Sequence, residues 1–430
     1  MTAPTTRRFG QGPAGAPSEV RLLLGARALR AFGDGLVSLL LPVHLVRLGF
    51  DAVGIGVLAT ATLAGSAVLT LSVGLYAHRF PPRTLLLCAG VLMVATGLLF
   101  PLADGFWPLF LIALVGTINP SSGDASVFLP LEQARLAQAV PDRDRTGLFA
   151  RYSLIGSLSA AFGALCAGGP EVLASATGID AGTAVEGAFV VYALLGVASL
   201  LLYRRLPSTP TGGASVDAGQ APVAPLRESR GIVLRLAALF SLDSFAGGLV
   251  VQSLLALWLF ERFGLSLAVA GAVFFWTGVL SAFSYLVAVR IAARIGLVNT
   301  MVFTHLPANV CLLLVPLAPG LGTAIALLLV RSLLSQMDVP TRTSYVMAVV
   351  TPGERAAAAS VTAVPRSLAA ALGPLLAGHL LAASGFGWPL ALGGGLKIAY
   401  DLMLLALFRN VRPPGEAGGR HRDRAMEKGP

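Results

Sequence analysis

The sequence predicts an all-α membrane protein in which twelve transmembrane helices form two pseudo-symmetric six-helix bundles. Of its 430 residues, 55% are hydrophobic and 12% are charged, whereas soluble domains carry about 25% charged residues. The apolar residues gather in continuous runs of roughly 20, the length that crosses a hydrocarbon core about 30 Å thick. Continuous runs favour helices over a β-barrel, whose strands alternate in hydrophobicity. The second half of the chain also repeats features of the first.

Twelve such runs follow one another. They span approximately Arg27–Val46, Val53–Tyr76, Leu85–Leu102, Phe106–Phe128, Leu148–Ala167, Gly187–Tyr203, Arg235–Phe260, Leu267–Ala288, Val298–Leu317, Leu321–Val346, Ala356–Ala382 and Pro389–Phe408. We expect residues 22–205 and 231–411 to form the two bundles. Residues 206–230 are rich in Pro, Gly and Ser, which predicts a cytoplasmic linker. Residues 1–21 and 412–430 are predicted to be disordered cytoplasmic tails.

Two nearly constant offsets relate the halves. An offset of 215 places Arg47, Gly49, Gly56 and Arg79 on Arg262, Gly264, Gly271 and Arg294. An offset of 210 places Pro130, Arg145, Gly163 and Gly168 on Pro340, Arg355, Gly373 and Gly378. Parallel six-helix repeats joined by a cytoplasmic linker are a transporter architecture.

The formal charge of +10 is distributed as in a membrane protein rather than a nucleic-acid-binding one. Arginines gather in alternate gaps between the runs and around the linker, for example Arg79, Arg83 and Arg145, while acidic residues dominate the other gaps. By the positive-inside rule, this asymmetry predicts that both termini and the linker are cytoplasmic. We therefore expect a multi-pass protein of a bacterial-type cell membrane that contacts the lipid bilayer and no nucleic acid.

The gap between the second and third runs carries a motif. It reads Gly74-Leu-Tyr-Ala-His78-Arg79-Phe80-Pro81-Pro82-Arg83. This resembles the G-x-x-x-D-R-x-G-R-R signature of the major facilitator superfamily, with His78 in place of the acid and Pro81 in place of the second Gly. The second half keeps Arg294 and Gly296 at the equivalent place. The resemblance implies a loop that latches the cytoplasmic side, so His78, Arg79 and Arg83 are gate candidates.

The first run contains two charges, although a charge at a helix centre in hydrocarbon costs roughly 2.5–3.5 kcal/mol. Arg30 and Asp34 are four residues apart and share a helix face. They either neutralise each other or face a cavity. The family resemblance places the first helix at the central cavity, so Asp34 is the first candidate for proton coupling and Arg30 a cavity candidate. Asp124 and Asp243 are the next candidates for carrying the proton.

The fourth run contains a polar stretch, Asn119–Asp124, where the family resemblance would place an Arg. Pro120 removes a backbone donor, and Gly123 loosens the following turn. Irregular backbone at membrane depth is tolerated where it lines water or packs on protein. We therefore predict a kink that either exposes polar groups, including Asn119 and Ser122, to the cavity or serves packing alone.

Glu132 falls on Arg342 under the offset of 210, so the halves place opposite charges at equivalent points. We interpret this pair as a candidate cytoplasmic gate. The later runs hold further candidate cavity residues, namely Gln252, Arg331, Gln336, Asp338 and Arg366. Arg331 and Asp338 are seven residues apart, which predicts that they share a helix face.

The arginines of the second half leave two interpretations open. Arg331, Arg342 and Arg366 could bind a carboxylate or phosphate in a bidentate manner, or be occupied by Asp243, Asp338 and Glu132. Lys397 and Asp401 are four residues apart in the last run and are interpreted as a structural pair, and His305 as a packing residue.

These observations predict a secondary active transporter that moves a small molecule by alternating access, most plausibly a proton-coupled exporter working as a monomer. One alternative is an organic-anion carrier, which an excess of cavity Arg over carboxylate would favour. Another is a non-transporting sensor or assembly protein with the same fold. The sequence has no nucleotide-binding loop, metal cluster or nucleophile motif, so we expect no cofactor, no metal and no enzymatic activity.

Overall fold

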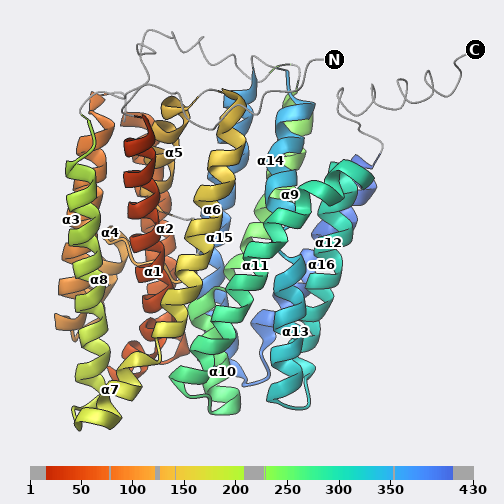
Figure 1. Ribbon diagram of the computed structural model, residues 1–430. Helices are drawn as coiled ribbons and strands as arrows, with labels where there is room; N and C mark the ends of the chain where they lie inside the picture. Colours follow the sequence, from red (N-terminus) through yellow and green to blue (C-terminus); the bar gives the residue numbers. More distant parts are fainter. Residues whose placement is uncertain are drawn as a thin grey trace, which may run out of the picture.

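The computed structural model describes residues 16–76, 79–121, 126–140, 142–207, 227, 229–351 and 354–409. These residues form helices that run side by side, and they contain no β-strand (Figure 1). The α-helices are α1 (Ala16–Arg47), α2 (Ala52–Tyr76), α3 (Pro82–Leu99), α4 (Phe106–Val115), α5 (Phe128–Ala139), α6 (Asp142–Cys166), α7 (Gly169–Thr177), α8 (Ala181–Arg204), α9 (Arg230–Gly248), α10 (Gln252–Phe263), α11 (Leu267–Ile295), α12 (Leu297–Leu314), α13 (Leu321–Leu334), α14 (Asp338–Val349), α15 (Arg355–Ala383) and α16 (Trp388–Phe408). The 3₁₀-helices η2 (Phe100–Leu102) and η3 (Val315–Leu317) follow α3 and α12.

The all-α membrane class is confirmed. Within the described ranges, ten stretches of helix are long and apolar enough to cross a membrane, and α4 and α13 are shorter apolar helices. The count of twelve membrane-crossing helices therefore stays a prediction.

Three of the predicted runs are broken helices. The fourth run ends as a helix at Val115, and α5 begins only at Phe128. The seventh is divided between α9 and α10, and the tenth between α13 and α14. Hydropathy could not predict the break in the seventh run, because residues 249–251 are as apolar as the helices around them, whereas the breaks in the fourth and tenth runs contain polar residues. Pro120 indicated the first break, which is wider than the predicted kink.

The two halves pack closely at one end of the molecule, the end that carries α7 (Figure 1). There α2 packs against α15, and α6 packs against α11. A Cβ added at Gly56 would lie 2.5 Å from the Pro374 carbonyl oxygen, and one added at Gly271 would lie 2.7 Å from that of Ala164. Glycine at these crossings lets the backbones touch, as small residues do in membrane helix packing.

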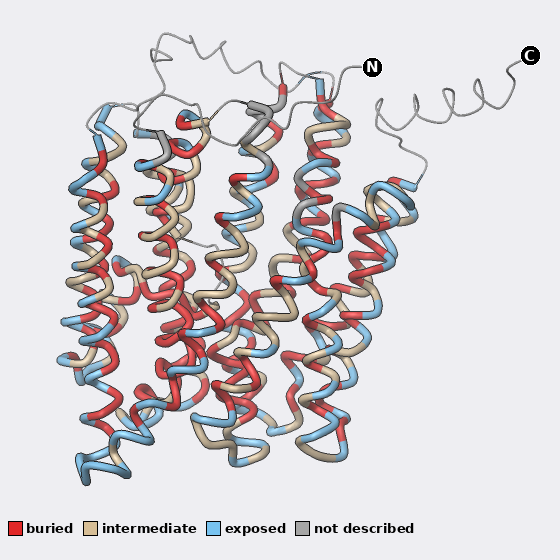
Figure 2. The backbone as a smooth tube through the Cα atoms, viewed as in Figure 1, coloured by how far each residue is buried: buried red, intermediate tan, exposed pale blue. Residues whose placement is uncertain are grey.

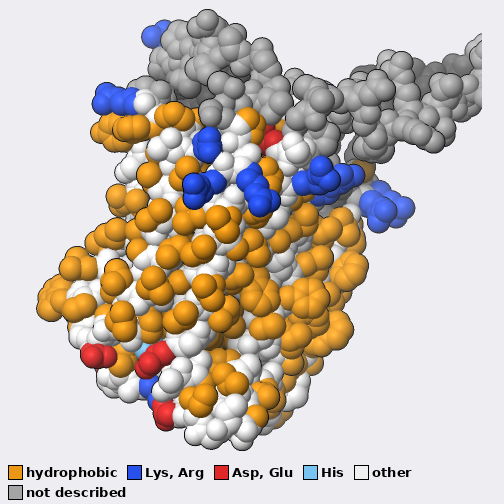
Figure 3. All heavy atoms as spheres, turned by 60° about the vertical axis from the view of Figure 1, so that its left-hand side comes forward, with side chains coloured by type: hydrophobic (Ala, Val, Ile, Leu, Met, Phe, Trp, Pro, Cys, Tyr) orange, Lys and Arg blue, Asp and Glu red, His pale blue; other side chains and the backbone are white. Residues whose placement is uncertain are grey.

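The outside of the bundle suits a lipid environment. Large apolar side chains such as Trp107, Trp276 and Trp388 are more than half exposed, whereas the buried residues lie on the inward helix faces (Figure 2). Figure 3 shows hydrophobic side chains covering the middle of one face, with Lys and Arg gathered toward the end where α1 begins. This distribution follows the predicted positive-inside bias.

The first helix begins earlier than predicted. α1 starts at Ala16, so residues 16–21, predicted as tail, belong to this helix. The reason is an ion pair between Glu19 and Arg135 of α5 at 2.7 Å, in which both side chains are 1% exposed. Arg135 also donates to the Pro207 carbonyl at 3.0 Å, which fixes the start of the predicted linker.

At the other end of the predicted linker, the Glu354 carboxylate accepts the N–H groups of Arg227 and Ser229. The start of the linker is therefore held by the N-terminal bundle, and its end is held by the C-terminal bundle. The rest of the linker, most of the N-terminal tail and the whole C-terminal tail lie outside the described residues.

Candidate functional site

A cavity of about 460 Å³ lies between the two halves. Residues of α1, α6 and the segment after α4 line it from the N-terminal half, and residues of α9, α10, α11, α13, α14 and α15 line it from the C-terminal half. Three arginines face it, Arg27 from the first half and Arg331 and Arg366 from the second. None of the described lining residues is acidic. The cavity wall is therefore cationic.

Arg27 reaches the cavity along α6. Its guanidinium carbon lies 5.0 Å from the centre of the Tyr152 ring, a cation–π contact. A Cβ at Gly156 would collide with the guanidinium, so only glycine leaves room for it there. Sequence analysis missed Arg27 as a cavity residue because it lies at the edge of the first apolar run. Its spacing of three residues from Arg30 could have indicated a second charge inside the helix.

Two cavity arginines come from the second half. The Nε of Arg331 is buried and has no hydrogen-bond partner among the described residues. Arg366 donates from Nε to the Ser244 hydroxyl at 3.3 Å. Neither forms an ion pair with a described carboxylate, whereas Arg342 does. The ion-pair interpretation therefore holds for Arg342, which pairs with Asp243 and Asp338. Arg331 and Arg366 face the cavity, where the anion-binding interpretation applies.

Amides and hydroxyls complete the lining. Tyr285 donates to the Gln336 amide oxygen at 3.0 Å. Gln252 donates to the Ser38 hydroxyl on α1 at 3.0 Å, a contact between the halves. Gln252 and Gln336 thus line the cavity as predicted from their runs.

The breaks in the fourth and seventh runs meet each other. The Pro120 carbonyl accepts the N–H of Ser253, the second residue of α10, at 3.0 Å. Two backbone groups left over by broken helices thus satisfy each other inside the bundle. Asn119 is buried, and its side-chain oxygen accepts from Ser121, which lines the cavity. Ser122 and Asp124 lie outside the described residues.

Arg30 belongs to a buried cluster in the N-terminal half. It ion-pairs with Glu132 and donates to the Tyr203 hydroxyl at 2.9 Å. Glu132 also accepts from the hydroxyls of Tyr152 and Tyr203, each at 2.6 Å. Phe128 lies under the guanidinium, with its ring centre 4.0 Å away. Arg30 was predicted as a cavity candidate, but it lies inside the N-terminal half and is not among the lining residues of the cavity.

Asp34 is buried on the same helix, near Tyr192, whose hydroxyl donates to the Thr117 carbonyl at 3.1 Å. That hydroxyl also lies 3.1 Å from the hydroxyl of Thr117. The hydrogen bonds of Arg30 run to Glu132 and Tyr203 instead. The main partners of Arg30 are thus Glu132 and Tyr203, and not Asp34.

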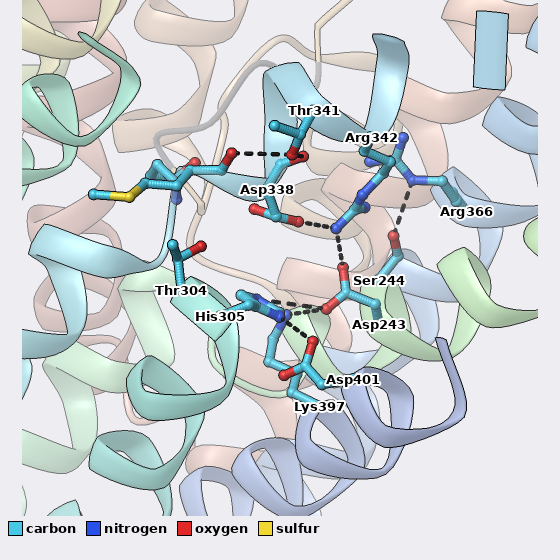
Figure 4. A network of polar contacts seen from close by, with 12 residues as sticks. Asp243, Ser244, Thr304, His305, Asp338, Thr341, Arg342, Arg366, Lys397 and Asp401 are labelled. Carbon is cyan, nitrogen blue, oxygen red and sulfur yellow. Dashed lines mark hydrogen bonds and ion pairs between the residues drawn. The ribbon is translucent and has the colours of Figure 1, made fainter. Parts of the chain in front are cut away.

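The C-terminal half contains a larger buried network (Figure 4). Asp243 of α9 lies at its centre and contacts Lys397 Nζ at 2.5 Å and Arg342 at 2.8 Å. Arg342 also pairs with Asp338. Asp401 accepts from Asn309 at 2.8 Å and lies 2.9 Å from Nδ1 of His305. We call Asp243, His305, Asp338, Arg342, Lys397 and Asp401 the Asp243 cluster.

Three interpretations of the second half are corrected by this geometry. Lys397 and Asp401 do not pair with each other, because Lys397 points to Asp243 and Asp401 to His305. His305 is a member of the polar network rather than a packing residue. Asp338 is not among the lining residues of the cavity, and it begins α14 beyond a turn at residues 335–337, so its shared face with Arg331 stays a prediction.

The gate candidates stay predictions. Glu132 and Arg342 each have opposite-charge partners within their own half. Arg83 donates to the Arg204 carbonyl at 2.6 Å, within the N-terminal half. The guanidinium of Arg79 lies over the ring of Tyr76. His78 lies outside the described residues.

Comparisons with known proteins agree with this fold. The family model of the Major Facilitator Superfamily matches residues 23–337. The uncharacterized membrane protein YJR124C of Saccharomyces cerevisiae is 24% identical over 427 residues, covering 92% of this chain and 95% of that protein.

Solved structures of transporters are also similar. A bacterial homologue of the human lysosomal transporter Spinster, inward-facing and unoccupied, superposes with a TM-score of 0.70 and 15% identity over 92% of this chain and 96% of its own. The inward-open xylose transporter XylE from E. coli has a TM-score of 0.69 and 14% identity over 90% of this chain and 96% of its own. At these identities the similarity concerns the fold.

Proposed function

Because the chain belongs to the Major Facilitator Superfamily and has the fold of a membrane transporter, we propose that it carries a small organic anion by alternating access. The substrate would bind between the halves, in the cavity lined by Arg27, Arg331 and Arg366. The halves would then rock about this site, as in transporters built from two repeats.

One observation carries the choice of substrate class. The cavity offers three guanidinium groups and no carboxylate among its described lining residues. Like charges around a poorly solvated space repel one another, and an anion relieves that repulsion. Arginine presents a planar fork of donors that matches a carboxylate or phosphate. This favours the organic-anion alternative over a carrier of cations or neutral drugs.

We also propose that transport is driven by protons, as predicted. Asp34 is buried beside Tyr192 and stays a candidate proton carrier. Asp243 is a weaker one, because Lys397 and Arg342 both stabilise its ionised form. Export stays a prediction. A wholly apolar cavity would suit the export of apolar drugs, and the three arginines of this cavity weaken that argument.

The test uses four aromatic probes of similar size that differ in charge, namely benzamide, benzoate, phthalate and trimesate. The purified full chain is incubated with each, and its thermal unfolding is recorded. We expect stabilisation to be absent with benzamide and to increase with the number of carboxylates, because a ligand that binds only the folded state raises its stability.

Substitutions then locate the binding. Arg331→Gln and Arg366→Gln should each weaken phthalate binding about 10- to 100-fold, the equivalent of one charge-assisted hydrogen-bonding pair of roughly 1.5–3 kcal/mol. Arg290→Gln on α11 is the matched control, because Arg290 is exposed and lies outside the cavity lining. Equal stabilisation by benzamide and phthalate, or no effect of both cavity substitutions, would refute the anion proposal.

A further inference from the structure

We propose that His305 is the proton-binding group that couples a proton to the anion, through the Asp243 cluster. The inference rests on the proposed anion transport and adds the place of the second ligand. His305 lies on α12, outside the cavity lining.

The imidazole lies between two buried carboxylates. Its Nδ1 is 2.9 Å from Asp401 Oδ1, and its Nε2 is 4.0 Å from Asp243 Oδ1. The Asn309 amide nitrogen lies 3.0 Å from the same Nδ1. In the tautomer that carries its proton on Nδ1, the ring donates to Asp401. A second proton on Nε2 would point at Asp243, so the resulting cation would have an acceptor on each side. Histidine is the side chain that most readily gains this proton near neutral pH.

Four helices contribute charged or titratable groups to the surroundings of His305. They are Asp243 on α9, Arg331 on α13, Asp338 and Arg342 on α14, and Lys397, Tyr400 and Asp401 on α16. The Asp243 cluster holds three carboxylates, those of Asp243, Asp338 and Asp401. It holds two permanent cations, Arg342 and Lys397. With a neutral His305 the cluster is therefore one positive charge short, and the cations outside it that offset this are Arg331 and Arg366, which face the cavity.

Arg366 connects this shortage to the cavity. It faces the cavity, and its Nε donates to Ser244, the neighbour of Asp243 on α9 (Figure 4). In the empty cavity, its charge offsets the third carboxylate. When an anion binds Arg366, that charge is shared with the anion. The cluster then lacks compensation, which is costly inside a membrane, and a proton on His305 restores it.

The inference predicts that anion and proton bind together. A proton entering on Nε2 stays on the ring while the halves reorient, and it leaves when the anion leaves Arg366. Each anion bound at Arg366 is thus accompanied by one proton on His305. The two ligands would therefore cross in the same direction, so an inward proton gradient would drive uptake of the anion rather than the predicted export.

The first test counts protons. The full chain in lipid nanodiscs is mixed with phthalate in weakly buffered solution at pH 7.5, with a pH-indicating dye. We expect proton uptake that is saturable in phthalate and is lost in His305→Gln and in Asp401→Asn. His379→Gln is the matched control, since His379 is exposed on α15 and contacts only the Leu375 carbonyl among the partners identified for it. Uptake that persists in both variants while they still bind phthalate overturns the inference, as does its loss in Asp34→Asn alone.

The second test does not depend on the probe, and it needs a folded variant only to assign the signal. The five histidines of the chain are labelled with ¹⁵N in the ring, and the wild-type spectrum is recorded from pH 5.5 to 8.5. The His305 signal is identified by its loss in His305→Gln, or by its displacement in Asp401→Asn. We expect it to change protonation within this range. A His305 signal that stays constant overturns the inference, whereas failure of wild type to bind any of the acids refutes the anion proposal alone.

Discussion

At the scale of single residues, the two halves contain buried charge pairs of opposite polarity. In the N-terminal half, Arg30 on α1 pairs with Glu132 on α5. In the C-terminal half, Asp243 on α9 pairs with Arg342 on α14. The repeat in the sequence aligned Glu132 with Arg342. The structure adds that the charge on the first helix of each half is also opposite in sign, Arg30 on α1 and Asp243 on α9. Each pair is therefore neutral within its own bundle.

This pairing predicts the cost of losing one partner. Glu132→Gln leaves the Arg30 charge buried and uncompensated, so we expect a loss of roughly 3–5 kcal/mol in stability. Thermal unfolding in detergent measures it, with Glu186→Gln on the exposed face of α8 as the control. An unfolding midpoint like that of the control would contradict a buried, charged pair.

Charge reversal separates this view from the gate hypothesis. The swap of Arg30→Glu with Glu132→Arg keeps the pair inside one half and should restore much of the lost stability. The swap of Glu132→Arg with Arg342→Glu keeps a pair only between the halves. Rescue of transport by the second swap but not the first would favour the gate.

Residue spacing alone could not predict these partners. Lys397 and Asp401 have the spacing of a helical ion pair, yet they bond to Asp243 and His305 on two other helices. A residue on a helix face also contacts residues of the neighbouring helices. In a bundle, the nearest opposite charge is often on another helix rather than four residues away on the same one. Intramembrane charges were therefore predictable from the sequence as sites of interest, whereas their partners were not.

At the scale of helices, close crossings set the shape of the interface between the halves. Gly56 and Gly378 lie against each other where α2 crosses α15. A Cβ at Gly378 would lie 2.5 Å from the Ala52 carbonyl oxygen, and a backbone atom cannot move aside as a flexible side chain can. The offset repeat singled out both Gly56 and Gly378, but only the structure shows that the two meet at this crossing.

Gly378→Leu should therefore separate the halves at this end. We expect a longer distance between spin labels at Val172 and Leu317, which are exposed on opposite halves there, in a background without the three native cysteines. Gly187→Leu is the control, because a Cβ at Gly187 meets nothing within 4 Å. An unchanged distance distribution in Gly378→Leu would mean that the crossing does not hold this end closed.

The breaks in the helices show where sequence reasoning fails at this scale. Pro120 indicated a break in the fourth run, but the breaks at residues 249–251 of the seventh run and 335–337 of the tenth contain no proline. Their breaks are supported by contacts from elsewhere, such as the Ser253 N–H that donates to the Pro120 carbonyl. A hydropathy profile cannot record such a contact between distant segments.

At the scale of the whole molecule, the architecture was the most predictable feature. The length of the apolar runs, and the need of backbone polar groups for hydrogen-bond partners inside lipid, leave few alternatives. The cavity was less so. Its lining combines residues from eight helices and from connecting segments of both halves, and Arg27 is part of it because Gly156 leaves room for a guanidinium.

The cationic cavity has an electrical consequence. Three guanidinium groups sit in the middle of the bundle, so turning the empty cavity from one side of the membrane to the other carries positive charge through part of the transmembrane field. Each elementary charge moved across the whole field is worth about 2.3 kcal/mol per 100 mV. A resting voltage would thus select the side on which the unloaded carrier waits. Loading a dianion should shrink the transient current that a voltage step evokes in reconstituted bilayers, and Arg331→Gln with Arg366→Gln should shrink it without any substrate.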